Sequence, residues 1–335
     1  MTRFQRLARA AGACAIFFVA LPVTQALAQD AHLLVVTGVS GDEAHAKQFH
    51  AWATTLIDAA KRKDGVADGN IIYLGERTDV DPARIRGRAT RENVQKAVSD
   101  IAARARPGDA VLILLVGHGS FDGRQAAFNL PGPDLTAADW AIELSKLAAV
   151  QVAFVNTASS SGAFTAAVAG PGRAVVTATR TGGERNETRF AAFFVEAFGD
   201  AAADADRNGH VSVLEAFDYA KNRVAKTYEQ DGLLLTEHAT LEDGAQGRLA
   251  ATLFLTAHPA DGGLQIDRTD PELVALADQR EAIQRQIDGL KLRKDGVEPA
   301  RYDQDMERLL TELALKTRAI REHQKVLEGT KGGRE

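Results

Sequence analysis

Two polar turns carry the residue types of a base and a nucleophile, and each follows an apolar segment. Residues 111–116 (VLILLV) run into the turn that contains His118, and residues 150–155 (VQVAFV) run into a serine cluster that contains Ser159. In an open α/β sheet, ligands and catalytic groups collect beyond the carboxyl ends of the strands. If both segments are strands of one parallel sheet, His118 and Ser159 face the same crevice at its edge.

The pair of turns resembles the active site of the caspase-like cysteine peptidases, above all the legumain family and its bacterial secreted branch. That family places a base in a His-Gly-Ser turn, here residues 118–120, and a nucleophile in an Ala-Cys-x-Ser-Gly turn, here residues 158–162 (ASSSG). Three further stretches are similar to bacterial members: residues 178–180 (ATR), 184–190 (ERNETRF) and 215–217 (EAF). The resemblance covers about residues 33–248, and it implies a caspase- or legumain-like three-layer sandwich of the α/β class with a mostly parallel sheet.

Serine stands at position 159, where the family has its cysteine, and the single cysteine of the chain is Cys14 in the N-terminal segment. A serine hydroxyl has a much higher pKa than a thiol, and it needs a base that a third group holds against it. The resemblance therefore favours a non-catalytic pseudopeptidase that binds or scaffolds a peptide or protein ligand at the strand-end crevice in the cell envelope. The alternative is an active peptidase or hydrolase that uses Ser159, with His118 as base and the Gly119 N–H as an oxyanion donor.

A charged segment, residues 179–190, leaves the predicted strand 173–178. In legumain-like peptidases the corresponding strand end borders the specificity pocket. The resemblance thus implies that this segment lines a pocket beside the two turns, through Arg180, Glu184, Arg185, Asn186 and Glu187. A solvated loop held by salt bridges is the alternative, since a charge cluster alone is a weak sign of a site.

Residues 204–215 match the twelve-residue loop of an EF-hand. In such loops alternate side chains point oxygens inward, a glycine at the sixth position allows the sharp turn, and the final glutamate offers two oxygens. The candidate ligands for a structural calcium ion are Asp204, Asp206, Asn208, His210 through its backbone carbonyl, Ser212 and Glu215. The alternative is a turn in which Asp204 caps and Glu215 is merely exposed.

The N-terminal segment has the three marks of a secretory signal peptide. Arginines occur at positions 3, 6 and 9, an apolar core covers residues 10–23, and residues 26–28 (ALA) form an A-x-A cleavage site. We expect cleavage after Ala28, a periplasmic or secreted product, and no transmembrane segment in the mature chain. The formal charge would change from −5 to −8, since three arginines and no acidic residue are lost. No nucleic-acid partner is expected for such a mildly acidic chain.

Apolar segments alternate with helical patterns from residue 32 to about residue 222, which predicts βαβ units and a parallel sheet. The predicted strands are residues 33–37, 70–74, 111–116, 150–155 and 173–178, and predicted helices over 190–203 and 213–226 flank the calcium-type loop. We assign residues 29–265 to this α/β domain, 266–325 to an antiparallel helical hairpin of coiled-coil type, and 326–335 to a flexible tail. The apolar repeat of the hairpin comprises Leu276, Ile283, Ile287, Leu290, Met306, Leu310, Leu313, Thr317 and Ile320. This hairpin is either self-contained or a candidate surface for a protein partner, and the sequence shows no feature that favours a partner.

Overall fold

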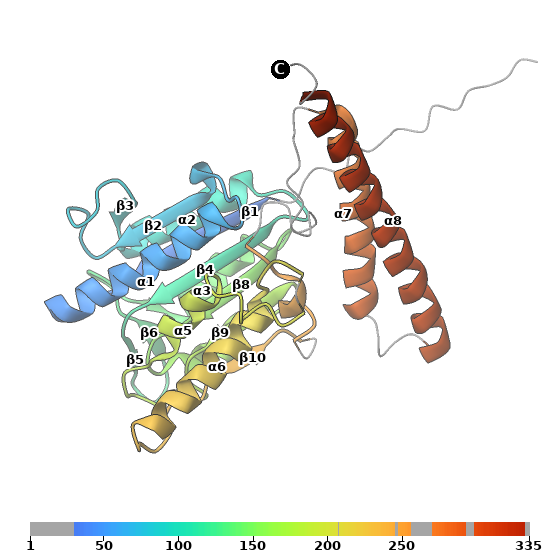
Figure 1. Ribbon diagram of the computed structural model, residues 1–335. Coiled ribbons are helices and arrows are strands. Elements are labelled where there is room, and N and C mark those ends of the chain that lie inside the picture. Colours follow the sequence, from blue (N-terminus) through green and yellow to red (C-terminus); the bar gives the residue numbers. More distant parts are fainter. Residues whose placement is uncertain (1–29, 207, 245–246, 256–269, 293–297, 332–335) are drawn as a thin grey trace, which may run out of the picture.

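The computed structural model describes residues 30–206, 208–244, 247–255, 270–292 and 298–331. The predicted signal peptide, residues 1–28, lies outside the described residues. Figure 1 shows a layered α/β body followed by two long helices near the C-terminus. Among the helices that the structure describes, none is long and apolar enough to cross a membrane.

The α/β body is built on a seven-stranded sheet with the strand order β10-β9-β8-β4-β1-β2-β3 (Figure 1). Its strands are β1 (Ala31–Thr37), β2 (Ile71–Gly75), β3 (Ile85–Arg88), β4 (Ala110–Val116), β8 (Gln151–Asn156), β9 (Arg173–Thr177) and β10 (Thr240–Glu242). Neighbouring strands pair in parallel, except that β10 is antiparallel to β9. The chain moves outward from β1 to β2 and β3 and then returns to β4 on the other side of β1. Ligand sites of open α/β sheets lie where the strand order reverses in this way.

Helices cover both faces of the sheet. Since alternate residues of a strand point to opposite faces, each strand contributes side chains to two separate apolar clusters. Leu112 and Leu114 of β4 pack in one apolar cluster, whereas Val111 and Ile113 pack in a second cluster on the other face. The first cluster includes α1 (Glu43–Arg62), α5 (Phe190–Ala197) and α6 (Val213–Gln230), and the second includes α2 (Arg91–Arg104), α3 (Ala137–Ser145) and α4 (Thr165–Val168). The predicted α/β class and mostly parallel sheet are confirmed.

The five predicted strands are all present, with ends that differ by one or two residues from those expected. The helix predicted over residues 190–203 is wrong in length, because α5 ends at Ala197 and a turn with Gly199 follows it. In contrast, α6 continues to Gln230, four residues beyond its predicted end.

Three short strands form a second, antiparallel sheet directly after β4: β5 (Gly119–Phe121), β6 (Ala126–Phe128) and β7 (Leu135–Thr136). Short 3-10 turns occur at η1 (Asp68–Asn70), η2 (Ser161–Phe164) and η3 (Ala250–Thr252). The Asn129 N–H, just after β6, donates a hydrogen bond to the His118 carbonyl at 3.0 Å. The small sheet therefore supports the turn that carries His118.

Near the C-terminus, α7 (Pro271–Leu292) and α8 (Pro299–Lys331) lie side by side (Figure 1). Hydrogen bonds join Gln279 to Lys316 and Asp270 to His323, so the two helices run antiparallel. Their contact includes the buried side chains Ile283, Ile287, Leu290 and Leu309.

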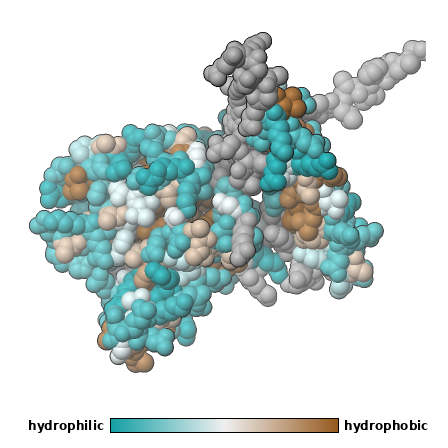
Figure 2. Space-filling model, viewed as in Figure 1, coloured by the Kyte–Doolittle hydropathy of each residue, from teal (hydrophilic) through white to brown (hydrophobic). Residues whose placement is uncertain are grey.

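Two details of this C-terminal part differ from the sequence prediction. Leu310 is 49% exposed and the adjacent Leu309 is buried instead, so the apolar face of α8 is offset by one residue at this turn. The tail expected from residue 326 is also wrong, because α8 continues to Lys331. Figure 2 shows a mostly hydrophilic face on which apolar residues gather on the C-terminal helices, where Leu310 and Leu315 are exposed.

Candidate functional site

His118 follows β4, and the turn after β1 fixes its imidazole. Its Nε2 lies 3.2 Å from the Ser40 carbonyl oxygen, and because a carbonyl can only accept, Nε2 carries the proton. In the neutral imidazole, Nδ1 is then the acceptor nitrogen. Two rings of α1, those of His45 and Phe49, contact the imidazole edge-on with centroids 5.3 and 5.4 Å away.

Ser159 follows β8, the strand next to β4, and is buried. Its Oγ donates a hydrogen bond to the Gly119 carbonyl at 3.1 Å and accepts one from the Gly119 N–H at 3.3 Å. Among the described contacts, none joins Ser159 Oγ to His118. The hydroxyl proton therefore points to a backbone carbonyl and not to the imidazole.

The turns after β4 and β8 pack so closely that a side chain on Gly119 has no room. A Cβ at this position would lie 2.3 Å from the Ser159 carbonyl oxygen. Ser160 has φ +58°, the left-handed region, and among the described residues it is the non-glycine residue with positive φ. Its N–H donates to the Glu184 carbonyl at 2.8 Å, which holds the sharp turn in place.

The crevice between the two turns brings His118 and Ser159 to the same place, as their positions after neighbouring strands predict. Its lining residues are Phe49, Trp52, Gly117, His118, Thr157, Ser159, Glu187, Thr188 and Ala191. Its volume is only about 10 Å³, which is about the room that one water molecule needs. The crevice is thus nearly filled by its own side chains.

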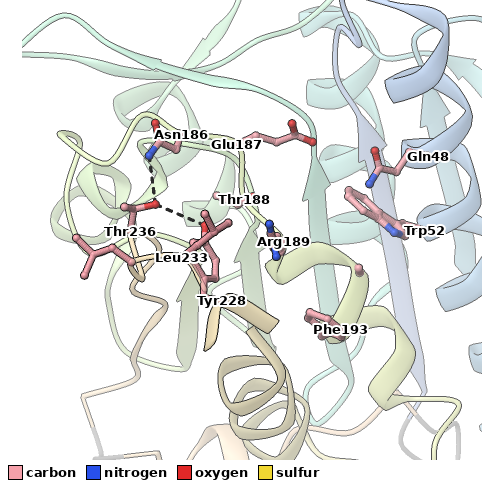
Figure 3. A pocket seen from close by; sticks show the side chains of 12 residues that line it. Gln48, Trp52, Asn186, Glu187, Thr188, Arg189, Phe193, Tyr228, Leu233 and Thr236 are labelled. Carbon is pink, nitrogen blue, oxygen red and sulfur yellow. Dashed lines mark hydrogen bonds between the residues drawn. The ribbon is translucent and has the colours of Figure 1, made fainter. Parts of the chain in front are cut away.

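A much larger cleft of about 680 Å³ adjoins the crevice and shares Trp52, Glu187 and Thr188 with it (Figure 3). Its full lining is Gln48, Trp52, Asn186, Glu187, Thr188, Arg189, Ala192, Phe193, Tyr228, Leu233, Leu234 and Thr236. We call this space the aromatic cleft. Sequence reasoning predicted Asn186 and Glu187 at a pocket but missed the aromatic part of this lining, because Trp52 and Phe193 occur at helical spacings that also predict core packing.

Fixed polar contacts shape the aromatic cleft. The Arg189 guanidinium lies 4.7 Å from the centroid of the Tyr228 ring and forms an ion pair with Asp231 at 2.5 Å. Asn186 donates to the Thr236 hydroxyl at 3.2 Å, and Tyr228 contacts the same hydroxyl at 3.5 Å (Figure 3).

Of the five residues predicted to line a pocket, Asn186 and Glu187 line the aromatic cleft. Arg180, Glu184 and Arg185 line neither the crevice nor the cleft. The Glu184 carboxylate accepts hydrogen bonds from the backbone N–H of Arg180 at 3.2 Å and of His238 at 3.1 Å. Arg185 donates to the Phe121 carbonyl at 3.1 Å. These side chains hold the segment together, while the next four residues, 186–189, face the cleft.

An ion pair links α1 to the segment 184–190 beside the crevice. His45 Nε2 lies 3.2 Å from a Glu187 oxygen, and His45 Nδ1 lies 2.7 Å from Asp42. Hydrogen bonds to Asp42 and then to Glu187 raise the pKa of His45. The charged form of His45 is therefore favoured where its ring contacts that of His118.

Buried Glu237 anchors the segment that forms the far wall of the cleft. Its two oxygens accept the backbone N–H groups of Arg189 and Phe190, each at 2.8 Å, at the start of α5. Burial raises the pKa of this carboxyl to about 7, against the lowering effect of the two N–H donors. Residues 236–238 thus pack on the helix start that carries Arg189.

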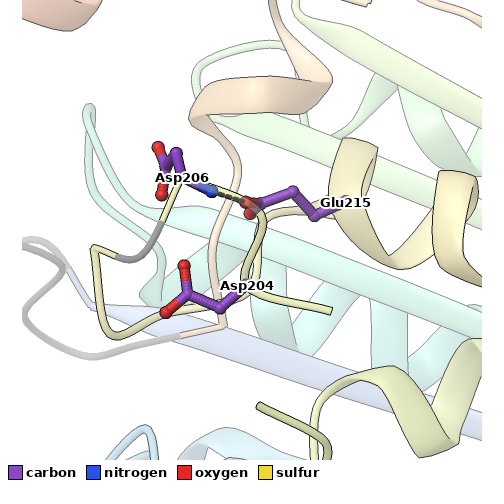
Figure 4. Close-up of side chains that lie close together, drawn as sticks. All are labelled: Asp204, Asp206 and Glu215. Atoms are coloured by element: carbon purple, nitrogen blue, oxygen red, sulfur yellow. Dashed lines mark hydrogen bonds between the residues drawn. The ribbon is translucent and has the colours of Figure 1, made fainter. Parts of the chain in front are cut away.

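In the predicted calcium loop, three carboxylates converge (Figure 4). Oxygens of Asp204, Asp206 and Glu215 all lie within 4.8 Å of one another. The Asp204 carboxylate accepts the N–H groups of Asn208 and Gly209 at 3.0 and 2.9 Å. Residue 207 lies outside the described residues.

The other candidate ligands of this loop have partners of their own. Asn208 donates from its side chain to Asp206 at 3.1 Å, and the Ser212 hydroxyl donates to Glu215 at 2.7 Å while it caps α6. The His210 ring lies 3.7 Å from Asp64, so this side chain points away from the carboxylates and leaves only its backbone for an ion.

Comparison with known proteins gives little further information. No family model matches the chain, and no curated protein matches it. Among solved structures, the chain is similar to a protein from Geobacter sulfurreducens determined by a structural-genomics project. The two share 13% sequence identity with a TM-score of 0.40, over 64% of this chain and 92% of the other.

Proposed function

We propose that this chain is an exported, non-catalytic homologue of the legumain-type, caspase-like peptidases, and that it binds a peptide or protein segment beside its strand-end crevice. The observation that carries the proposal is the state of the Ser159 hydroxyl. A serine nucleophile needs a base within hydrogen-bond reach, whereas Ser159 Oγ is bonded on both sides to the Gly119 backbone.

The backbone donor of the site supports the same conclusion. The resemblance to legumain-type peptidases implies that the Gly119 N–H polarises a substrate carbonyl. In this structure the same N–H donates to Ser159 Oγ instead. A crevice of about 10 Å³ also leaves no space for a peptide carbonyl between His118 and Ser159. The alternative of an active hydrolase requires Ser159 to leave Gly119 and turn to His118 Nδ1.

The aromatic cleft is the place where we propose that the peptide binds. Its volume of about 680 Å³ can hold several side chains of a bound peptide. Its lining contains both aromatic residues and polar groups. Leu233 and Leu234 on its rim are 52% and 85% exposed. Exposed apolar side chains beside an aromatic cleft favour a ligand with apolar residues.

We also propose that the loop 204–215 binds one calcium ion, which stabilises the connection between α5 and α6. Three hard carboxylates within 4.8 Å of one another support this role, and so does Gly209 with φ +92° at the sixth loop position. The ion would be structural, because the loop contributes no residue to the crevice or to the cleft.

Calcium should raise the melting temperature of the protein by several degrees, since a ligand at 100 times its Kd stabilises the folded state by about 2.7 kcal/mol. Asp204→Ala should abolish this rise. Asp122→Asn is the matched control, because Asp122 also accepts two N–H groups in an exposed turn outside the loop. A parent protein whose melting temperature ignores calcium would contradict the site.

A peptide in the aromatic cleft should change the fluorescence of Trp52. The chain has two tryptophans, and the other, Trp140, is fully buried in the core. We expect an acetylated and amidated hexapeptide of leucine, phenylalanine and serine to shift the emission of the parent and of Trp140→Phe, but not that of Trp52→Phe. Phe193→Ala should weaken binding about tenfold. A shift that persists in Trp52→Phe would place the peptide elsewhere.

Ser159→Cys should not cleave short peptides, even after asparagine or aspartate as the resemblance implies, because the crevice of about 10 Å³ has no room for a peptide carbonyl. A thiol has a lower pKa than a hydroxyl, so part of it would be thiolate beside His118, and the absence of turnover then identifies the closed crevice as the cause. The parent and Ser159→Ala are the controls, and product formation is followed by mass spectrometry. Turnover by the parent that disappears in Ser159→Ala would establish a serine hydrolase instead.

A further inference from the structure

We propose that a second cavity, distinct from the aromatic cleft, binds a ligand with an alkylammonium group. This β1–β2 cavity lies at the carboxyl ends of β1 and β2 and has a volume of about 660 Å³. Its walls come from the turn after β1, the first turns of α1, and the chain from the end of β2 to the start of β3. Its position, at the strand ends of an open α/β sheet, is where such folds bind ligands.

Apolar side chains form much of the wall. Phe49 and Ile85 are buried, and Val39 and Ala46 line the same space. Tyr73 is also buried, and its hydroxyl is 3.1 Å from His50 Nδ1, so this polar atom has a partner of its own. A cavity of this size with apolar walls and few polar groups is typical of a small-ligand site.

Glu76 supplies the charged group of the cavity. Its Oε2 accepts two hydrogen bonds from buried Ser40, one from the N–H at 3.0 Å and one from the hydroxyl at 2.6 Å. Among the described residues, none donates to the second oxygen, Oε1. The carboxylate is therefore held in one orientation and keeps one oxygen for a ligand.

The remaining charged side chains of the lining are already paired. The pairs are Lys47 with Glu43 at 2.8 Å, Arg77 with Asp79 at 2.5 Å, His45 with Asp42 at 2.7 Å, and His50 with Asp81 at 3.6 Å. Glu76 is thus the carboxylate left to a cationic ligand. An ammonium group can donate to Oε1 while its alkyl chain packs on Phe49 and Ile85.

Ser40 joins this cavity to the crevice. Its N–H and hydroxyl hold Glu76, and its carbonyl accepts the Nε2–H of His118. Phe49 lines both spaces as well. A ligand bound to Glu76 therefore contacts a carboxylate that is held by the same residue whose carbonyl accepts the His118 Nε2–H.

The test is calorimetric titration of the purified full chain with two ammonium probes, hexylammonium and Nα-acetyl-lysine methylamide, and with neutral 1-hexanol. Both ammonium probes should bind more tightly than hexanol. Glu76→Gln keeps an oxygen for Ser40 and removes the charge, so it should weaken ammonium binding at least tenfold. The matched control is Glu43→Gln on the same rim, which should change binding less than twofold because Lys47 already pairs with Glu43.

The two probes also distinguish the source of the ammonium group. Tighter binding of the lysine derivative indicates a peptide lysine, and tighter binding of hexylammonium indicates a free alkylamine.

In the parent, ammonium binding should also shift the imidazole NMR signals of His118 through Ser40. Equal affinity for hexanol and hexylammonium in the parent would overturn the proposal without any variant, as would equal ammonium binding by Glu76→Gln and the parent.

Discussion

The contact between the turns that follow β4 and β8 is the constraint on which the candidate site depends. Gly119 approaches so closely that a Cβ would lie 2.3 Å from the Ser159 carbonyl, and its N–H and carbonyl both bond to Ser159 Oγ. The next residue, Ser160, has a left-handed backbone with φ +58°. The same contact places the serine beside a histidine and removes its hydroxyl from the reach of that histidine. A site with a histidine and a serine at neighbouring strand ends is thereby held closed, and side chains fill most of the remaining space.

Around this closed centre, the structure keeps two open spaces. Trp52 is shared by the crevice and the aromatic cleft, and Phe49 is shared by the crevice and the β1–β2 cavity. Both residues belong to α1, whose position against the sheet therefore shapes all three spaces. His45, on the same helix, pairs with Glu187 beside the crevice. Shared side chains of α1 thus connect each open space to the crevice that contains His118.

The sequence predicts the buried framework well and the surface of the site poorly. Strands such as β4 and β8 are apolar throughout because helices cover both faces, and this signal fixes the positions of His118 and Ser159 at their ends. In contrast, β5 to β7 and β10 have only two or three residues each, too few for any periodicity. The charged segment 179–190 predicts a site, but side-chain direction decides that Glu187 and Arg189 face the cleft while Arg180 and Arg185 do not. On α8, Leu309 and Leu310 are both apolar, and only packing against α7 decides which is buried.

The central claim is that the Ser159 hydroxyl is held by Gly119 and is not activated by His118. The most direct measurement is reaction of the parent protein with a fluorophosphonate, which forms a stable adduct only with an activated serine. We predict that intact-mass spectrometry finds no adduct on Ser159 after prolonged incubation at neutral pH. An adduct on Ser159 that forms in the parent and is lost in His118→Ala would contradict the account and establish a working base and nucleophile.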